Sequence, residues 1–426
     1  MQNQIYNSNI LHQHQQHYPQ QQQQQQHPHA LLYASQDRSV VLVDIPASIE
    51  KSSPVRLLSV VPLATPHILP EPKNPNVVFN QELLDIHNKL RDTVVSALEK
   101  IRKEHAAEWC LERKIAATDA QDPIFPLMAH DFKINLGLLQ SSSEDPLDIV
   151  DYDTNTHFDI TDIYQTTVCN PSHQYHNLKI AVTGHTTLDF IIPPRSSFLL
   201  APVQSSINTF NNYVSRVGSF NFVLLDPPWP NRSAERCKAA YDTLHNHKDL
   251  LLLPLESALR DNGLIGVWVT NKPKWRHFVI QRLFPKWGVE YAGEWIWLKV
   301  TKTGEPIFNL ESVMRKPYEV LLFGRRPPSK RQLTMNHKWR RGNGGERYSS
   351  PNIEAQSEEP CGSPPQSGVN LMPQKVIVAV PDLHSRKPCL NGMYFMFCVP
   401  LFHYMLTGAF FQRLNTAFHA HQLHRL

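Results

Sequence analysis

The amino-acid sequence predicts an α/β fold, with a mostly parallel sheet and helices on both of its faces. Short, continuous apolar runs recur from about residue 188 onward, and helix-compatible stretches lie between them. Continuous rather than alternating apolar runs are typical of strands buried on both faces, and the alternation of strands with helices is the α/β pattern. The expected strands are 188–194, 197–202, 220–225, 263–270, 295–300, 318–324 and 375–380, and the expected helices are 247–261 and 273–285.

Composition excludes several classes of protein. The 426 residues carry a net charge of only +4, which excludes a histone-like basic protein but leaves room for a local basic patch. Only 16 residues are Gly, which argues against a Gly-rich dinucleotide binder or a Walker-type nucleotide binder. The six Cys include no C-x-x-C pair, so we expect reduced thiols in a nuclear protein, with the cytoplasm as the alternative.

The N-terminal part divides into a tail and a first domain. Residues 1–76 open with a Gln/His tract and continue with many Pro, so we expect a disordered tail, with metal binding by its histidines as the alternative. Residues 77–187 are expected to form a helical or α+β domain. Its best element is a helix over 81–107, because apolar side chains repeat there at three- and four-residue spacing: Leu83, Ile86, Leu90, Val94, Ala97, Leu98 and Ile101.

Residues 188–388 are expected to form the α/β domain, interrupted by a long loop over 325–373. The loop lacks apolar periodicity, and its first half, 325–347, holds eight Lys/Arg against one Glu. We expect this half to contact the phosphate backbone of a nucleic acid. A solvated loop or a nuclear localisation signal is the alternative interpretation.

The residues that carry chemistry follow the predicted strand 220–225. Asp226, Pro227, Pro228 and Trp229 come directly after its sequence FNFVLL. In open α/β sheets, ligands bind at the carboxyl ends of the strands. The two prolines fix the backbone and carry no N–H, so we expect carbonyl groups that point outward without competing donors.

These four residues suit a planar ring that bears an amino group. The amine can donate one hydrogen to the Asp226 carboxylate and one to the Pro227 carbonyl, while the ring stacks on Trp229. Two in-plane acceptors draw the nitrogen toward tetrahedral geometry and free its lone pair. A methyl donor placed opposite would then react by proximity and orientation, and no metal is needed.

The sequence at this point resembles the MT-A70 family of adenine N6-methyltransferases. Asp-Pro-Pro-Trp after an apolar strand is the signature of that family. IIPPRSSFLL precedes the motif, and PPWPNRSAERCKAAY, GLIGVWVTNKPKW, WIWLKV, RKPYEVLLFGRR and HSRKP follow in the family's order. Over about 190–388 the chain is similar to the methyltransferase-like protein 4 branch. The resemblance implies a permuted Rossmann-like class I fold and the cofactor S-adenosylmethionine. It also implies adenine in nucleic acid as substrate: internal 2′-O-methyladenosine of a small nuclear RNA, or DNA.

The resemblance also implies roles for individual residues. Asp226, Pro227, Pro228 and Trp229 match the catalytic motif, and Asp226 lies near the amino-acid end of the cofactor in the family. Lys387 matches the family lysine that reaches the cofactor, and Ser196 and Ser197 fall near a cofactor-contacting segment. The positions that line the substrate pocket are Trp229, Asn231, Arg232 and Glu319.

The segment 389–426 departs from the family pattern. The family continues with a strand reading Leu-Phe-Ala-Arg and a Trp…Gly-Asn-Glu segment that hold the adenosine part of the cofactor, and neither occurs after Lys387. We interpret the segment as an alternative exon or a different reading frame rather than a membrane anchor, although Met393 to Phe411 are almost wholly apolar. Two hypotheses therefore stay open: an active methyltransferase, and an inactive nucleic-acid-binding form with an incomplete cofactor pocket.

Overall fold

The computed structural model describes residues 29–51, 53, 56–69, 81–115, 147–148, 157–182, 186–230, 246–312, 315–328, 372–383 and 386–390. A seven-stranded sheet dominates it, in the order β1-β2-β15-β13-β14-β12-β11. Its strands are β1 (Leu31–Ala34), β2 (Val40–Val43), β11 (Phe220–Leu225), β12 (Leu259–Val269), β13 (Glu290–Lys299), β14 (Tyr318–Arg325) and β15 (Lys375–Ala379).

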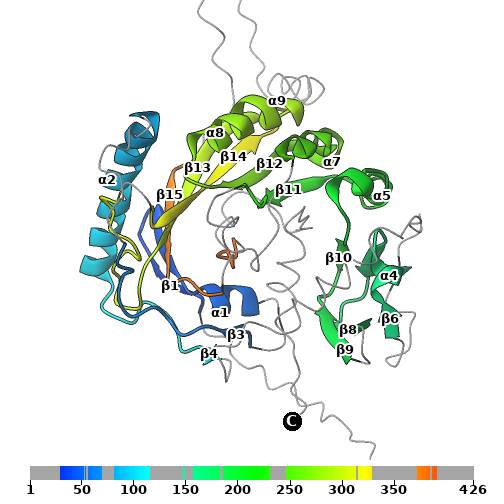
Figure 1. The fold of residues 1–426 in the computed structure, drawn as a ribbon, viewed down its shortest axis with the longest axis horizontal. Helices are drawn as coiled ribbons and strands as arrows, with labels where there is room; N and C mark the ends of the chain where they lie inside the picture. The colour runs from blue at the N-terminus through cyan, green and yellow to red at the C-terminus, as the bar shows by residue number, and fades with distance from the viewer. Residues whose placement is uncertain are drawn as a thin grey trace, which may run out of the picture.

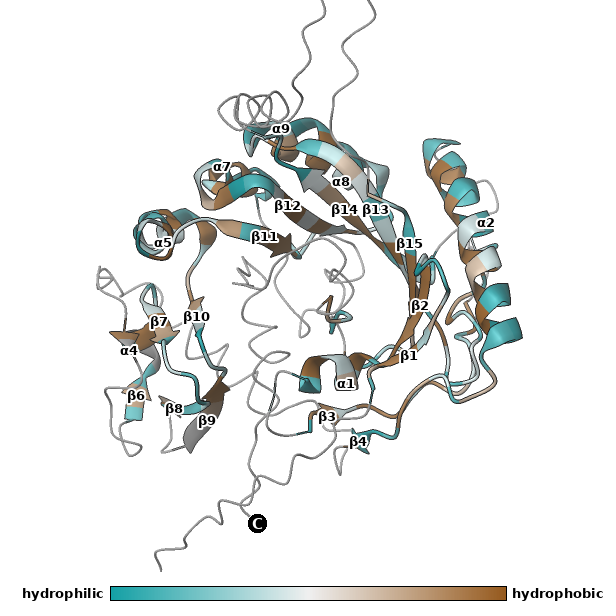
Figure 2. Cartoon of the chain, turned by 180° about the vertical axis from the view of Figure 1, so that it is seen from behind, coloured by the Kyte–Doolittle hydropathy of each residue, from teal (hydrophilic) through white to brown (hydrophobic). Residues whose placement is uncertain are grey.

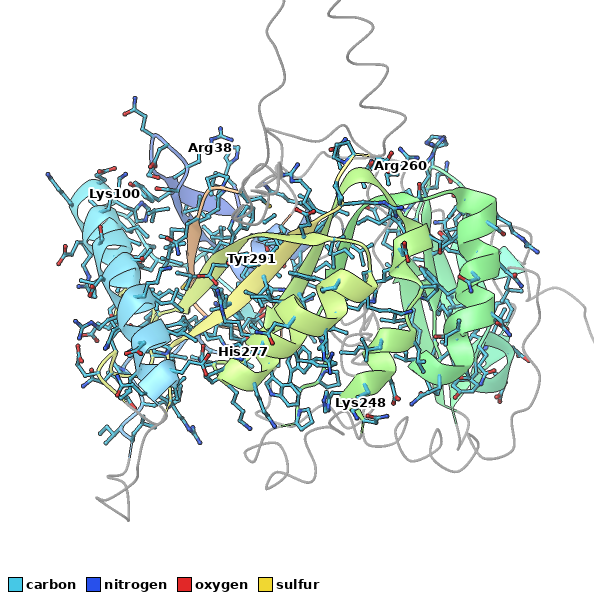
Figure 3. The ribbon with its side chains drawn as sticks, turned by 90° about the horizontal axis from the view of Figure 1, so that it is seen from above. Arg38, Lys100, Lys248, Arg260, His277 and Tyr291 are labelled. Atoms are coloured by element: carbon cyan, nitrogen blue, oxygen red, sulfur yellow. The ribbon has the colours of Figure 1, made fainter. Side chains whose placement is uncertain are left out.

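The sheet is mostly parallel, as expected. β11 pairs with β12, β13 with β15 and β15 with β2 in parallel, whereas β14 and β1 run antiparallel to their neighbours. The carboxyl ends of the parallel strands therefore meet at one edge of the sheet. Because β14 runs the other way, its first residues, Tyr318 and Glu319, join that edge. Arg260, at the start of β12, and Arg38, just before β2, lie on the opposite side (Figure 3).

Helices cover mainly one face of this sheet. They are α2 (Gln81–Glu104), α5 (Val203–Val217), α7 (Leu255–Ala258), α8 (Pro273–Phe278) and α9 (Phe284–Lys286), with a π-helical turn over Val279–Leu283 and a 3₁₀ turn over His247–Leu252 (Figure 1). Their apolar side chains share one core with Val40, Ile265, Ile296 and Val378. On the other face, Ile45 of α1 (Ile45–Glu50) packs with Trp268, Trp295 and Trp297. Helices were expected on both faces of the sheet. The second face is covered by the short helix α1, so this expectation is confirmed only in part.

The N-terminal part of the chain belongs to the central sheet. Residues 1–28 lie outside the described residues, but β1, β2 and α1 are formed by residues that the composition assigns to a disordered tail. That expectation was wrong because the fully buried run Val40–Val43 finds a partner strand, β15, at the far end of the sequence. The hydrophobic strands of the sheet, including β2, are brown in Figure 2.

The predicted helix over 81–107 is present as α2, but it does not found a separate domain. Its buried residues include Leu90, Val94, Leu98 and Ile101, and they lie in the same core cluster as the sheet residues. Figure 2 shows that α2 carries both teal and brown residues, as a helix with one buried stripe does. The boundary expected near residue 187 is therefore wrong for this helix.

Two predicted strands lie outside the central sheet. The run 188–194 falls mostly in β9 (Thr186–Ile192), which pairs with β8 (His176–Val182). On its other side, β8 pairs with β6 (His157–Asp159). The run 197–202 begins in β10 (Ser196–Leu199), which forms a second small sheet with β7 (Thr167–Asn170) and β5 (Leu147–Asp148). The remaining elements are α4 (Ile160–Ile163) and the pair β3 (Leu58–Ser59) and β4 (Lys114–Ile115).

Within the described part of the chain, no helix is both long and apolar enough to cross a membrane. The apolar run 393–411 and most of the loop 325–373 lie outside the described residues.

Candidate active site

Four charged side chains, alternately acidic and basic, lie next to one another at the carboxyl edge of the sheet. Asp226 follows β11, Lys387 follows β15, Glu319 is the second residue of β14, and Lys299 ends β13. The Lys387 ammonium lies 3.5 Å from an Asp226 oxygen and 2.5 Å from Glu319. Lys299 lies 2.5 Å from the other oxygen of Glu319. Strands that are remote in the sequence thus bring three predicted site residues together.

Two indole rings form the wall beside Lys387. The ammonium lies 5.5 Å from the ring centre of Trp268 and 5.6 Å from that of Trp297. Lys299 lies 4.5 Å from the same Trp297 ring. Both rings are almost fully buried, and cations are attracted to the faces of such rings. The position of Lys387 is therefore fixed by two carboxylates and two aromatic faces.

The charges of this cluster perturb the Glu319 carboxyl. Burial by itself would raise its pKa, but the ammonium groups of Lys299 and Lys387 and their hydrogen bonds outweigh burial and hold the pKa well below its usual range. The ionised form of Glu319 is thus favoured over the neutral form. Its negative charge attracts the ammonium groups of both Lys299 and Lys387, and it offsets their mutual repulsion close to Asp226.

We expect Glu319→Gln to weaken the fold and to change its pH dependence. A carboxyl whose pKa is depressed in the folded state contributes stability that is present above its unfolded pKa and is lost as the pH falls through its folded pKa. The variant should lose about 1–3 kcal/mol of unfolding free energy at pH 7, because two partly buried ammonium groups lose their shared partner. Its unfolding free energy should also fall less than that of the wild type between pH 7 and pH 3. Urea unfolding at several pH values measures both, and a parallel fall in the two proteins would contradict the assignment.

The backbone of the predicted motif differs from the expected form at Pro227. The Trp229 N–H donates to the Pro227 carbonyl over 2.8 Å, which closes a three-residue turn around Pro228. The expectation that this carbonyl has no competing donor was therefore wrong. A carbonyl oxygen has two lone pairs, so Pro227 keeps one acceptor site.

Trp229 is buried and does not offer the open ring face that the sequence predicts. Its side chain is only 3% exposed. The ring stacks on Trp275 at 4.8 Å between centres, and its indole N–H donates to the Trp268 carbonyl over 2.8 Å. The interpretation of Trp229 as a free stacking surface is wrong in this structure, because the turn around Pro228 directs the side chain into the core formed by α8. There it anchors the motif to β12.

The remaining predicted residues do not join the cluster or cannot be placed. Ser196 donates to the Pro193 carbonyl over 2.6 Å, and Ser197 donates to the Cys169 sulfur over 3.2 Å. Both contacts lie in or beside the small sheet of β10 rather than at the edge that holds Asp226. Asn231 and Arg232 lie outside the described residues.

The sequence reasoning missed Lys299, Trp268 and Trp297. Each lies near the end of a predicted strand, in GLIGVWVT or WIWLKV. A polar residue at the carboxyl end of a buried strand was the signal that singled out Asp226, and it would have found Lys299 as well. Trp268 and Trp297 carry no such signal, because a buried tryptophan in a strand is ordinarily part of the core.

A carboxylate and an ammonium 3.5 Å apart suit a zwitterion. The α-amino and α-carboxylate groups of a free amino acid carry the opposite charges and would pair with Asp226 and Lys387 respectively. The carbonyl of Pro227 comes directly after Asp226 in the chain, and its second lone pair suits an amino group. The edge therefore has the chemistry to hold a cofactor with an amino-acid end next to an aromatic amine.

The amino-acid sequence was compared with those of known proteins. Residues 220–343, which run from β11 through β14, match the MT-A70 family model. The chain is 28% identical over 396 residues to the N6-methyladenosine RNA methyltransferase MTA1 of Pyricularia oryzae, covering 85% of this chain and 86% of that protein.

Two further relatives extend the comparison. The chain is 29% identical over 329 residues to the human N(6)-adenine-specific methyltransferase METTL4, covering 74% of this chain and 61% of that protein. It is 31% identical over 147 residues to a DNA N6-methyl methyltransferase of Caenorhabditis elegans, covering 34% of this chain and 38% of that protein. With the motif, the strand order and these matches together, the chain resembles the MT-A70 family of methyltransferases, and METTL4 within it.

Proposed function

We propose that the protein is an S-adenosylmethionine-dependent N6-adenine methyltransferase that acts on RNA or DNA in the nucleus. The observation that carries the proposal is Asp226, at the carboxyl end of β11, held 3.5 Å from Lys387. The names of the relatives support the reaction, since they act on adenine N6 in RNA or in DNA. Internal 2′-O-methyladenosine of a small nuclear RNA is the substrate that we propose first.

The residues of the edge would divide the work. Lys387 and Asp226 fit the amino-acid end of S-adenosylmethionine, which supplies an activated methyl group when bound. Asp226 and the free acceptor site of Pro227 would hold the adenine amine, and they favour the tetrahedral nitrogen of the transition state over the planar one of the substrate. Preorganised acceptors of this kind are a major source of rate enhancement because they need no rearrangement during the reaction.

The direct test is methyl transfer from labelled S-adenosylmethionine to matched substrates, by the protein with residues 391–426 replaced by a family-like C-terminus. We would compare an RNA with one internal 2′-O-methyladenosine, the same RNA with adenosine, and DNA of the same sequence. Mass spectrometry of the digested nucleosides must show the methyl group on N6. Transfer to none of the three, or to another atom, would contradict the proposal.

One observation favours the second candidate, an inactive nucleic-acid-binding form. Within the described residues β11 has a partner strand on one side only, so the strand that carries Asp226 stands at the edge of the sheet. The family elements that are missing after Lys387 are those that hold the adenosine part of the cofactor. Isothermal titration with S-adenosylmethionine separates the two candidates, because the inactive form binds RNA but not the cofactor.

The basic loop can be tested through the salt dependence of RNA binding. Its ends, at residues 328 and 372, follow β14 and precede β15, so both lie at the edge opposite Asp226. Deleting 329–347 while keeping Arg325 and Arg326 should flatten the dependence of log K on log salt by about 0.7–0.9 for each phosphate that the loop neutralises in the intact protein. Catalysis on a short RNA should not change. An unaltered slope would favour a solvated loop or a localisation signal.

A further inference from the structure

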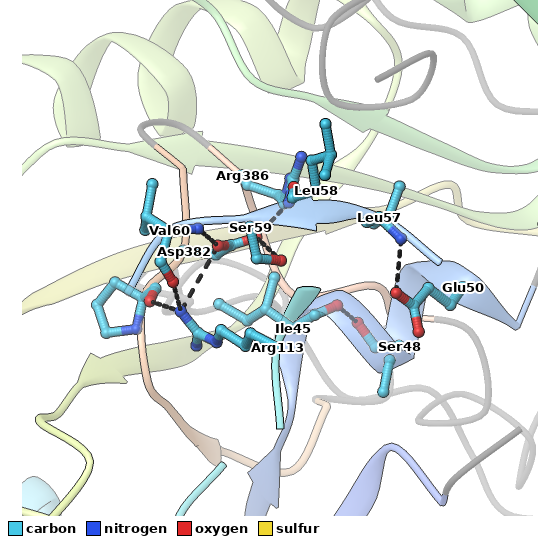
Figure 4. A network of polar contacts seen from close by, with 12 residues as sticks. Ile45, Ser48, Glu50, Leu57, Leu58, Ser59, Val60, Arg113, Asp382 and Arg386 are labelled. Carbon is cyan, nitrogen blue, oxygen red and sulfur yellow. Dashed lines mark hydrogen bonds and ion pairs between the residues drawn. The ribbon is translucent and has the colours of Figure 1, made fainter. Parts of the chain in front are cut away.

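Lys387 is held in place by a polar cluster that lies outside the matched MT-A70 segment. The cluster consists of Arg113, Asp382 and Arg386, together with the backbone of residues 57–60; we call it the N-terminal clamp (Figure 4). The side chains of Asp382, Arg113 and Arg386 are at most 1% exposed. The MT-A70 model matches residues 220–343, so none of these residues lies within that match, although Arg386 belongs to the HSRKP segment that resembles the family.

Asp382 is the centre of the clamp. It accepts from the Val60 N–H over 3.0 Å and from the Ser59 hydroxyl over 3.3 Å, and it forms an ion pair with Arg386. Figure 4 shows these contacts between the segment that follows β15 and the N-terminal segment around Ser59.

Arg113 ties the end of β15 to the same place. Its guanidinium lies 3.5 Å from Asp382 and donates to the carbonyls of Pro381, over 2.8 Å, and Val380, over 3.0 Å. The chain leaves the sheet at Val380, so these bonds fix the direction in which it runs toward Lys387.

Lys387 lies between two anchors to the N-terminal segment. On one side, Arg386 donates to the Leu58 carbonyl over 3.0 Å. On the other side, the Cys389 N–H donates to the Ser48 hydroxyl over 3.2 Å, and the buried Leu390 packs in the core that contains Ile45. With both flanks held, the Lys387 side chain has little choice of position beside Asp226 and Glu319.

The clamp is not built for stability alone. Two nitrogens of the Arg386 guanidinium, Nε and Nη2, are buried without a hydrogen-bond partner among the described residues. Burial lowers the pKa of Arg386 despite its pairing with Asp382. A buried ion pair of this kind often contributes no more stability than apolar residues of similar size would, so its value lies in the geometry that it fixes.

We infer that the N-terminal clamp positions Lys387, and that Arg386, Asp382 and Arg113 are positioning residues of the site that act through Lys387. The inference rests on the proposed function only in that it gives Lys387 a task there. The N-terminal segment that enters the central sheet is, on this inference, part of the site rather than an appendage to it.

The test measures the exposure of individual lysines in the full chain, and it needs neither cofactor nor turnover. Brief acylation with an amine-reactive ester, followed by peptide mass spectrometry, gives a modification rate for each lysine. In Arg386→Met we expect Lys387 to react several-fold faster than in the wild type. The modification rate at Lys375 should not change. This lysine is 8% exposed and begins β15, the strand that precedes Lys387 in the chain. Arg56→Met, which removes a half-exposed arginine beside the clamp, is the matched control and should alter neither rate.

Three outcomes would overturn the inference. One is an unchanged rate at Lys387 in Arg386→Met. Another is a parallel rise at Lys375, which would mean that Arg386 supports only the fold. The third applies if the Arg386→Met protein does not fold. Ser59→Ala, which removes a single hydrogen bond to Asp382, is then used in its place and should raise the Lys387 rate selectively. An unchanged Lys387 rate in Ser59→Ala would contradict the inference. The clamp would be upheld, and the proposed function refuted, if the Lys387 rate rose selectively in Arg386→Met while the protein without that substitution transferred no methyl group in the assay described above.

Discussion

Asp226→Asn is expected to abolish most methyl transfer while leaving nucleic-acid affinity nearly unchanged. The amide keeps the shape of the carboxylate, but it lacks the charge that pairs with Lys387 at 3.5 Å and can present an NH₂ group to the substrate amine. Loss of one preorganised electrostatic contact typically lowers the rate by about 10²–10³-fold. Single-turnover methyl transfer and a separate RNA-binding measurement distinguish the two effects.

Asp249→Asn is the matched control for this variant. Asp249 lies in the 3₁₀ turn over His247–Leu252, and its side chain accepts from Gln204 and Asn246 rather than from a residue of the charge cluster. The control should keep its activity. Both variants are measured against a version of the protein with a family-like C-terminus. Retention of more than about a tenth of its activity by Asp226→Asn would mean that the substitution had removed about 1.4 kcal/mol or less of transition-state stabilisation, and the assignment of Asp226 would fail.

The second large effect concerns the C-terminal segment. We expect the full chain to bind S-adenosylmethionine poorly and to express as a poorly folded protein. Replacing residues 391–426 with a family-like C-terminus, while keeping Cys389 and Leu390 with their contacts to Ser48 and Ile45, should restore both solubility and cofactor binding. The reason is β11: its unpaired side is an open edge among the described residues, and open edges favour aggregation.

Isothermal titration and the soluble fraction after expression measure the two effects. We expect affinity for the cofactor to rise at least about tenfold, which corresponds to about 1.4 kcal/mol of additional binding free energy. A replacement with the same composition in scrambled order should restore neither property. A micromolar dissociation constant for the unmodified chain would show that our interpretation of residues 389–426 is wrong.

The sequence alone predicts that the missing C-terminal elements leave β15 without a neighbour, and the structure places the open edge elsewhere. β15 lies between β13 and β2, so both of its sides are paired. The two edge strands of the described central sheet are β1 and β11, and β11 is the one that leads into Asp226. The expectation failed because it considered only the residues next to β15 in the sequence, whereas the neighbour that covers β15 comes from the N-terminus.

The same limit explains what sequence reasoning could and could not predict. The strands β11, β12, β13, β14 and β15 were predicted because their apolar runs are long enough to be read locally. β1 and β2 were missed because four-residue strands among prolines give no local signal. Asp226 was found from its place directly after a buried strand, and Lys387 and Glu319 were found through the resemblance. Lys299 and the buried position of Trp229 depend on which strands are neighbours, and local patterns do not encode that.

The pairing of β2 with β15 also has a consequence for synthesis of the protein. Val40 pairs with Val376, so β2, which is synthesised early, can form this pairing only after β15 has been synthesised near the end of translation. Contacts so remote in sequence are slow to form because the long intervening chain must first be ordered. Until residue 379 leaves the ribosome, the apolar hairpin of β1 and β2 has no partner to cover its edge. We therefore expect the nascent chain to be prone to aggregation until β15 has been synthesised.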